Sequence, residues 1–187
     1  MRLYSRLPFF LLLAWLSLSA CSAGNVQTLE GRVTGIADGD TLYVLDAARK
    51  SHKIRLLGID APERGQAFGE RSKQSLAKLA YRQQASVDWQ GRDAYGRILG
   101  RVRIAPHDCR QGNCPKTVDA NHEQVRLGLA WWNKKFADTQ FPGDARTYES
   151  AEREARAAKA GLWAERNPVP PWRWRYANRN ENDKVRP

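Results

Sequence analysis

Three carboxylates and two arginines in the first hundred residues have the side-chain types needed to break a phosphodiester bond. Asp40 and Asp60 carry hard oxygen ligands that suit Ca²⁺ or Mg²⁺. Glu63 could orient or deprotonate a water, and Arg55 and Arg97 could grip a phosphate with planar, permanently charged donors. A catalyst of phosphodiester hydrolysis must neutralise the anionic diester, position a water and stabilise the charge added in the transition state. The five side chains therefore predict metal-assisted phosphodiester hydrolysis.

Each short stretch that carries these side chains also has a purely local interpretation. Residues 38–41 (Asp-Gly-Asp-Thr) are typical of a hairpin turn, since Asp-Gly pairs accept positive φ angles. Residues 60–63 (Asp-Ala-Pro-Glu) look like a helix start with Asp60 as the N-cap, and residues 95–97 look like the end of a loop before a strand. The joint appearance of the stretches, in this order, favours a site over three separate local features.

The elements that must position these side chains follow the order β-β-β-α-β-β. Alternating segments rich in β-branched residues predict the strands, and Leu76, Leu79 and Ala80 at helical spacing predict a helix after the third strand. Five short strands with a helix after the third are compatible with an OB-type barrel. Strands are expected within 29–45 (two, separated at 38–40) and at 53–59, 85–89 and 98–104, and helices at about 70–83, 121–130 and 145–159.

The same stretches, together with Gly128-Leu129-Ala130 after them, resemble the thermonucleases, the staphylococcal-nuclease-like, Ca²⁺-dependent enzymes that cut DNA and RNA. The resemblance covers about residues 29–165. It implies an α+β fold, an OB-type five-stranded β-barrel with three helices, and Ca²⁺ as the cofactor. It further implies DNA and RNA as substrates, and departure of the 5′-oxygen to leave 3′-phosphate ends. We also expect a monomer.

The resemblance assigns a role to each of the reactive positions. Glu63 matches the residue proposed as general base or water-orienting group, and Arg55 and Arg97 match the arginines that bind the scissile phosphate. A backbone carbonyl at residue 61 completes the protein ligation of the metal, so Ala is tolerated where the family usually has Thr. The three positions that match the calcium ligands are Asp40, Asp60 and Ala61.

The nucleotide pocket is less sharply specified than the phosphate site. Tyr95 matches a tyrosine that lines the pocket in the family. Aromatic residues after Gly128 could stack on a base, or they could equally belong to the core. Lys134 stands where the founding member has a pocket tyrosine, so the expected substrate pocket on this side consists of Trp132, Lys134 and Phe136.

The N-terminus predicts export. Residues 1–20 combine a basic start with an apolar stretch of signal-peptide length, too short to span a membrane comfortably. The Leu-Ser-Ala-Cys that ends at Cys21 resembles a lipobox, which predicts lipidation of Cys21 and a membrane anchor, with residues 21–28 as a linker. Ordinary secretion, with cleavage near Ala20 or Ala23, is the alternative. We expect an exported protein facing the periplasm or cell surface, in the outer membrane if the source is Gram-negative.

Export also accounts for the odd number of cysteines, three in all. If Cys21 carries lipid, Cys109 and Cys114 remain as a pair, and an oxidising compartment favours a disulfide between them. The alternative, a metal site in which His107 joins the two cysteines, lacks an evident fourth ligand and fits no common zinc spacing.

The net charge of +11 favours a polyanionic partner. Loss of residues 1–20 removes two arginines and lowers the charge only to +9, so the basic character belongs to the exported protein. Residues 166–187, rich in Pro, Trp and Arg, predict an extended tail that could touch nucleic acid or an anionic membrane, or remain solvated. The rival to an enzyme is an OB-type module that binds without catalysis, but no member of the ligand and arginine set is missing.

Overall fold

A closed five-stranded β-barrel forms the body of the computed structural model, which describes residues 26–109 and 114–185. The strands neighbour one another in the order β3-β2-β1-β5-β6, and a parallel pairing of β3 with β6 closes the barrel. All other pairings within it are antiparallel. The strand bounds are Gln27–Asp38 (β1), Thr41–Leu45 (β2), Ser51–Leu56 (β3), Gln84–Arg92 (β5) and Ile98–Ile104 (β6).

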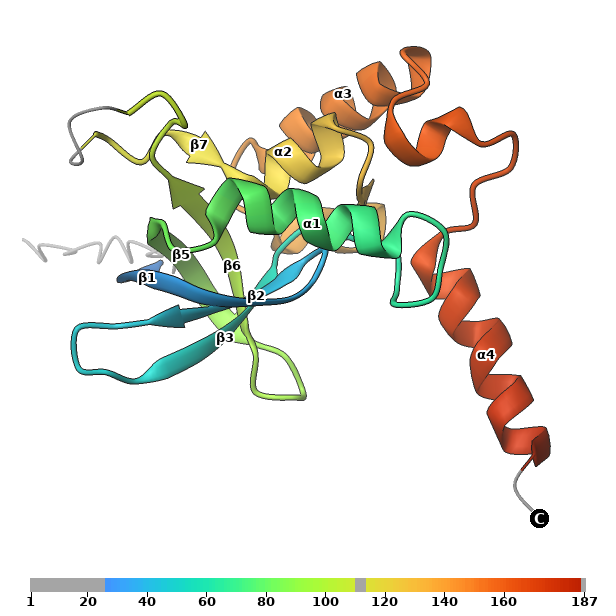
Figure 1. Cartoon of the computed structure of the whole chain (residues 1–187), viewed down its shortest axis with the longest axis horizontal. Helices are drawn as coiled ribbons and strands as arrows, with labels where there is room; N and C mark the ends of the chain where they lie inside the picture. Colours follow the sequence, from blue (N-terminus) through green and yellow to red (C-terminus); the bar gives the residue numbers. More distant parts are fainter. Residues whose placement is uncertain (1–25, 110–113, 186–187) are drawn as a thin grey trace, which may run out of the picture.

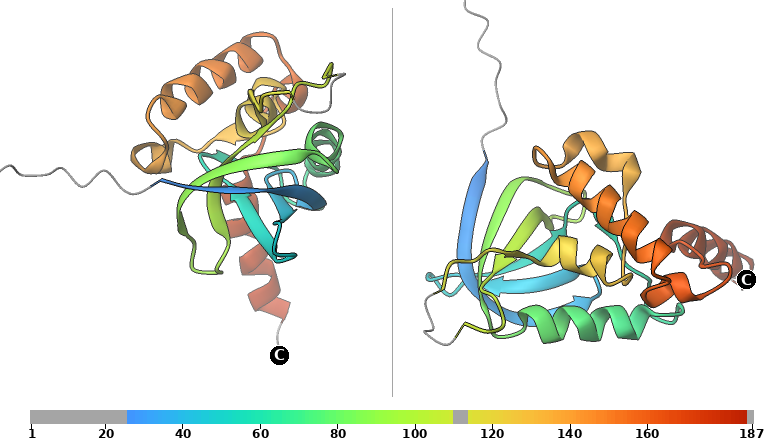
Figure 2. Two further views of the ribbon diagram at one scale, coloured as in Figure 1. Left: turned by 90° about the vertical axis from the view of Figure 1, so that its left-hand side faces the viewer. Right: turned by 90° about the horizontal axis from the view of Figure 1, so that it is seen from above.

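Within the described residues, four α-helices surround the barrel or extend from it (Figures 1 and 2). Three short strands complete the β-structure. Strand β7 (Val118–Asp119) extends the barrel sheet beside β6, and β4 (Ile59–Asp60) forms a separate two-stranded sheet with β8 (Trp131–Trp132). The helices are α1 (Gly69–Ala80), α2 (Ala120–Arg126), α3 (Asp144–Ala157) and α4 (Pro171–Val185), with 3₁₀ segments at Lys134–Thr139 and Gly161–Ala164.

The barrel interior is a closely packed apolar core, as the alternation in the strands predicted. In β6 every second residue, from Ile98 to Ile104, is buried, which is the period expected of a strand with one face inside. Helix α1 adds Leu76 and Ala80 to the same core. The predicted OB-type α+β fold is therefore confirmed.

Two buried amides join α2 to the barrel. Asn121 accepts a bond from the backbone N–H of Val102 (3.1 Å) and donates to the carbonyls of Leu57 (2.9 Å) and Gly100 (3.0 Å). Gln124 donates to the carbonyl of Gly39 (2.7 Å), directly before the first predicted metal ligand. Buried polar side chains are stable only when they are paired in this way, so these contacts hold α2 and the β1–β2 turn in one arrangement.

The predicted helix start at residues 60–63 is wrong. Asp60 lies in strand β4, and α1 begins only at Gly69, without a side-chain cap at Phe68. The backbone folds back on itself here: a Cβ on Gly69 would collide with the carbonyl oxygen of Glu63. Glycine at residue 69 therefore permits the turn that delays the helix and leaves Asp60 and Glu63 free for other contacts.

The predicted extended tail is also wrong, because residues 171–185 form α4. Pro171 is the first helical residue, where proline is tolerated since its missing N–H would have no intrahelical partner. Pro170 accepts the backbone bonds of Arg173 and Trp174, and no proline follows until residue 187. In Figure 1, α4 extends away from the barrel beside the loop that leads into α1.

Other expectations fall on or near the limits of the described chain. The structure joins Cys109 and Cys114 by a disulfide, with Cα atoms 5.9 Å apart, as predicted. The signal peptide, Cys21 and most of the linker lie outside the described residues, and β1 begins at Gln27, two residues before the expected start of the domain. Within the described ranges, none of the helices has the length and apolar character needed to cross a bilayer.

Candidate active site

The two predicted metal-binding aspartates are held together by Arg55. One Nη of Arg55 lies 2.9 Å from Oδ2 of Asp40, and the other lies 2.9 Å from Oδ1 of Asp60. Arg55 also donates to the carbonyl of Ile59 (3.0 Å), which orients the guanidinium along strand β4. Both carboxylates are therefore paired with the same guanidinium group, one with each of its terminal nitrogens.

The backbone around Asp40 explains why this aspartate is rigid. Its N–H donates to Asp38 (3.1 Å), its carbonyl accepts from Leu56 (2.8 Å), and its Oδ2 accepts from the N–H of Ala61 (2.7 Å). Gly39 lies so close to α1 that a Cβ there would collide with the side chain of Ser72. The β1–β2 turn is thus both a turn, as its residues predicted, and a mount for a carboxylate.

Because the two carboxylates are buried, positive charge beside them is required to stabilise their ionised form. The side chains of Asp40 and Asp60 are only 8% and 2% exposed. Burial raises the pKa of Asp40 to about 7, with Asp38 and Asp60 adding to the effect, while Arg55 acts against it. A cation that reaches this pair therefore gains more than it would at the protein surface.

Glu63 and Asp60 share a partner that the sequence analysis missed, Arg175 of α4. Its Nη2 lies 2.7 Å from Asp60 Oδ2, and its Nη1 lies 2.6 Å from Glu63 Oε1 and 3.1 Å from Asp60 Oδ1. The hydrogen bonds to Asp60 raise the pKa of Arg175 above its ordinary value. The Trp-Arg-Trp-Arg sequence at residues 172–175 indicated a surface contact, but nothing in its spacing pointed to Asp60 or Glu63.

Arg97 and Tyr95 reach the site from the β5–β6 turn. The Nε of Arg97 lies 2.6 Å from Asp93, and its guanidinium lies 5.7 Å from the centre of the Tyr95 ring. Gly96, between them, has a φ of 77°, a value that glycine adopts without strain. Tyr95 is 86% exposed, so its ring is free to meet a ligand.

The structure brings the predicted metal and phosphate residues to one cavity of about 350 Å³. Tyr95 and Arg175 line it as well. The predicted members of its wall are Asp40, Arg55, Asp60, Ala61, Glu63 and Arg97.

The other predicted pocket residues lie elsewhere. Trp132, Lys134 and Phe136 line a second cavity of about 480 Å³, which shares Asp60 and Arg175 with the first but not Tyr95. Trp132 is 9% exposed, packs in the core and donates its indole N–H to Gln140 (3.3 Å), whereas Phe136 is 47% exposed. The core alternative therefore describes Trp132, and Phe136 is the aromatic side chain available for stacking.

The residues present fit a hard divalent cation. Asp40 and Asp60 place buried carboxylate oxygens side by side, next to the backbone of Ala61. Within the described ranges, no three His, Cys, Asp or Glu side chains come together as a potential metal site. Two carboxylates and a backbone oxygen leave coordination positions for water and phosphate, as hard oxygen-preferring cations require.

Comparisons with known proteins agree with this geometry. The family model described as staphylococcal nuclease homologue matches residues 53–165. The chain belongs to the staphylococcal nuclease family. It is 43% identical over 150 residues to a micrococcal nuclease of Shigella flexneri, covering 80% of this chain and 82% of the relative. It is 38% identical to an uncharacterized endonuclease of Haemophilus influenzae (88% and 82% covered) and 38% identical to Protein ParB of Escherichia coli (83% and 84%).

As a member of the staphylococcal nuclease family, the chain is a hydrolase of the nuclease class. The matched segment contains Arg55, Asp60, Glu63 and Arg97, while Asp40 comes before it in the β1–β2 turn. Arg175 and the whole of α4 come after it. The cavity thus combines side chains of the family domain with one from a segment outside the family match.

Proposed function

We propose that this protein is a Ca²⁺-dependent nuclease that hydrolyses phosphodiester bonds of DNA and RNA and leaves 3′-phosphate ends. The observation that carries the proposal is the buried Asp40–Asp60 pair, bridged by Arg55, in one cavity with Glu63 and Arg97. Family membership supports hydrolysis of nucleic acid, and the hard oxygen donors support Ca²⁺.

Asp40, Asp60 and the backbone carbonyl of Ala61 would hold the cation. When bound, the cation supplies Lewis-acid polarisation of a phosphoryl oxygen and neutralises charge that develops in the transition state. The arginines add to this stabilisation from the protein itself: Arg97 and Arg55 line the same cavity and present planar N–H donors to phosphate oxygens.

Glu63 is the group that would handle the proton. Its carboxylate orients a water, accepts a proton as the water oxygen bonds to phosphorus, and the bond from phosphorus to the 5′-oxygen breaks. The 5′-oxygen takes up a proton from solvent water and leaves as a hydroxyl, the other strand end keeps a 3′-phosphate, and Glu63 later returns its proton to solvent. Because Glu63 is paired with Arg175, this ion pair must open before Glu63 can work as a base.

Digestion tests the proposal directly. Single- and double-stranded DNA and RNA are incubated with Ca²⁺, Mg²⁺ or chelator, and the product ends are identified by mass spectrometry. We expect cleavage with Ca²⁺, none with chelator, 3′-phosphate ends, and a severe loss of rate in Glu63→Gln and Arg97→Ala. Glu70→Gln, which alters an exposed carboxylate on α1, is the matched control for Glu63. Binding without cleavage under every metal would instead favour the non-catalytic OB-type module.

The proposal includes export and a lipid anchor at Cys21, with the nuclease acting as a monomer outside the cytoplasm. It rests on the signal-like residues 1–20 and the lipobox-like residues before Cys21. Cys21→Ser should move the protein from the membrane fraction to the soluble fraction after cell breakage, and unchanged fractionation would contradict the anchor. Sedimentation of the soluble variant tests the monomer.

A further inference from the structure

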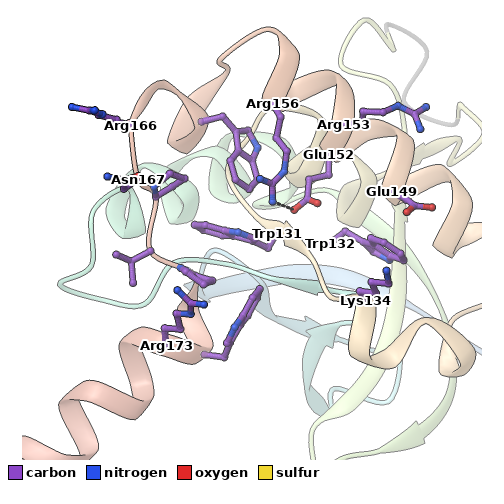
Figure 3. A pocket seen from close by; sticks show the side chains of 15 residues that line it. Trp131, Trp132, Lys134, Glu149, Glu152, Arg153, Arg156, Arg166, Asn167 and Arg173 are labelled. Carbon is purple, nitrogen blue, oxygen red and sulfur yellow. Dashed lines mark ion pairs between the residues drawn. The ribbon is translucent and has the colours of Figure 1, made fainter.

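A groove of about 880 Å³ lies between α3, the Gly161–Ala164 segment and the chain leading into α4, and the function proposed above does not use it (Figure 3). Tryptophans form much of its wall: Trp131 contacts Trp163 edge to face (5.0 Å between ring centres) and Trp172 likewise (6.3 Å). Trp172 is 45% exposed at the rim. Such a volume is at the upper end of the range of about 300–1,000 Å³ typical of small-molecule sites, which suits a segment of polymer.

The groove is also basic. Five cationic side chains line it against the carboxylates Glu149 and Glu152, a surplus of three positive charges. Figure 3 shows that these cations come from several sides of the groove: α3, the segment leading into α4, the first turn of α4 and the start of the Lys134–Thr139 segment. They are Lys134, Arg153, Arg156, Arg166 and Arg173.

Trp163 contributes its ring to the wall of the groove. Its buried indole Nε1 has no hydrogen-bond partner within the described part of the chain, although the ring lines the groove and carries the Arg156 guanidinium at 3.6 Å from a ring centre.

The groove and the catalytic cavity are neighbours of one intermediate cavity. The intermediate cavity of about 480 Å³ shares Trp132, Lys134 and Trp172 with the groove, and shares Asp60 and Arg175 with the catalytic cavity. A flexible polyanion whose phosphate lies at Arg55 and Arg97 can therefore continue past Lys134 into the groove.

We propose that this groove binds the part of a single-stranded nucleic acid that flanks the scissile phosphate. The inference rests on the proposed nuclease function. Alternating aromatic rings and cations suit unpaired bases that stack while phosphates pair with Arg and Lys. Paired bases in a duplex are covered by their own stacking and would not reach the tryptophans, so the groove favours single strands.

Binding in chelator tests the groove without cleavage. Anisotropy is measured for labelled dT₂ and dT₁₀ with wild type, Trp172→Ala and the double variant Arg166→Ala/Arg173→Ala. The matched controls are Tyr81→Ala and Lys50→Ala/Lys78→Ala, exposed residues of the same kinds outside the groove. We expect both groove variants to bind dT₁₀ about tenfold more weakly, with dT₂ changed less than about twofold and the controls unchanged. The charge variant should also flatten the salt dependence by about 0.7 per lost phosphate contact.

Three results would overturn this proposal. Affinity could fall equally in the groove and control variants, or equally for dT₂ and dT₁₀. Alternatively, the groove variants could lose only binding to phosphatidylserine vesicles, which would make the surface a membrane contact. Because the oligonucleotides are measured without metal, failure of cleavage in every metal would contradict the nuclease proposal while leaving the binding result intact.

A second inference comes from the ion pairs of Arg175, independently of the groove. Both carboxylate oxygens of Asp60 accept from guanidinium groups, and Arg175 contacts each of them and Glu63. We infer that Arg175 is a tethered cation that competes with the divalent metal for Asp60 and leaves Asp60 and Glu63 when the metal binds. When Arg175 leaves, the residues at the start of α4 and just before it stay bound to the domain. They are held by the hydrogen bond from Gln66 to the Val169 carbonyl (2.6 Å) and by the contact of Trp172 with Trp131.

Calorimetric Ca²⁺ binding, without nucleic acid, tests this competition. Arg175→Gln should bind Ca²⁺ at least about fivefold more tightly than wild type, because a positive charge no longer has to be displaced. Lys78→Gln, which alters an exposed cation on α1 without an ion pair among the described residues, should match wild type. Unchanged or weaker Ca²⁺ binding in Arg175→Gln would overturn the inference, and a lower kcat with unchanged Ca²⁺ affinity would identify Arg175 as a phosphate ligand instead. No Ca²⁺ binding in any of the three proteins would contradict the calcium proposal itself.

Discussion

The candidate catalytic cavity has two sides of different construction, one formed by the barrel and the other by the C-terminal segment. The barrel supplies short, buried aspartates that are held by backbone bonds, as Asp40 is held by Ala61. The C-terminal segment supplies Arg175, a long side chain that is 41% exposed and contacts the site only through its end. Substitutions on the barrel side are therefore expected to affect both function and folding stability. Substitutions on the C-terminal side are expected to affect function with little loss of stability.

The sharpest test of this comparison is Arg55→Ala. It removes the guanidinium between Asp40 and Asp60, and Asp40 has no other ion-pair partner within the described ranges. Breaking a buried pair costs about 3–5 kcal/mol, so we expect a large fall in the unfolding free energy together with loss of cleavage. Urea unfolding and oligonucleotide digestion measure the two effects.

Arg97→Ala is the matched control for that variant. Its pair with Asp93 is partly exposed, so the unfolding free energy should fall by less than about 1 kcal/mol although cleavage is lost. If both arginine variants lowered the unfolding free energy equally, the proposed difference between the buried Arg55 and the partly exposed Arg97 would be contradicted.

Glu63→Gln should separate chemistry from stability. We expect kcat to fall about 10²- to 10⁴-fold, the range for loss of a general base, with the melting temperature nearly unchanged because the Glu63 side chain is 37% exposed. Single-turnover kinetics at saturating substrate measure the chemical step. A kcat within a few fold of that of Glu70→Gln would show that another group handles the proton.

Removal of residues 166–187 should leave the family domain folded. The loss of the Trp131–Trp172 contact is expected to lower the unfolding free energy by about 1–2 kcal/mol. The kcat/KM for dT₁₀ should fall relative to that for dT₂, since one wall of the groove is gone. Deletion of residues 180–187 alone is the control, and failure of the shorter chain to fold would show that the C-terminal segment is part of the core.

The smallest effect is expected for Tyr95→Ala. The side chain is 86% exposed, so the unfolding free energy should change by less than about 0.5 kcal/mol. Loss of stacking beside Arg97 should raise KM several fold with kcat preserved, as measured by steady-state digestion of a short oligonucleotide. A lower kcat at unchanged KM would assign Tyr95 to the chemistry and not to binding.

Sequence patterns predicted the barrel strands that carry one side of the candidate site, because the information for a strand is local. Alternation along β6 identifies a strand with one buried face, and the Asp-Gly turn before β2 places a carboxylate at a defined point. The helix start at residues 60–63 failed because a cap pattern competes with a strand pairing far along the chain, that of Asp60 with Trp131. Trp132 was ambiguous for the same reason, since its burial depends on packing and not on spacing.

The amino-acid sequence was enough to predict the family, the order of the barrel strands along the chain, and the carboxylates and arginines of the candidate site. Those follow from side-chain type and short-range period, which a linear chain already contains. Only the tertiary structure decided that Arg175 reaches Asp60 across 115 residues and that the tryptophans of three segments form one groove. Such contacts depend on where α4 docks, and docking is the sum of many weak contacts whose partners are distant in the sequence.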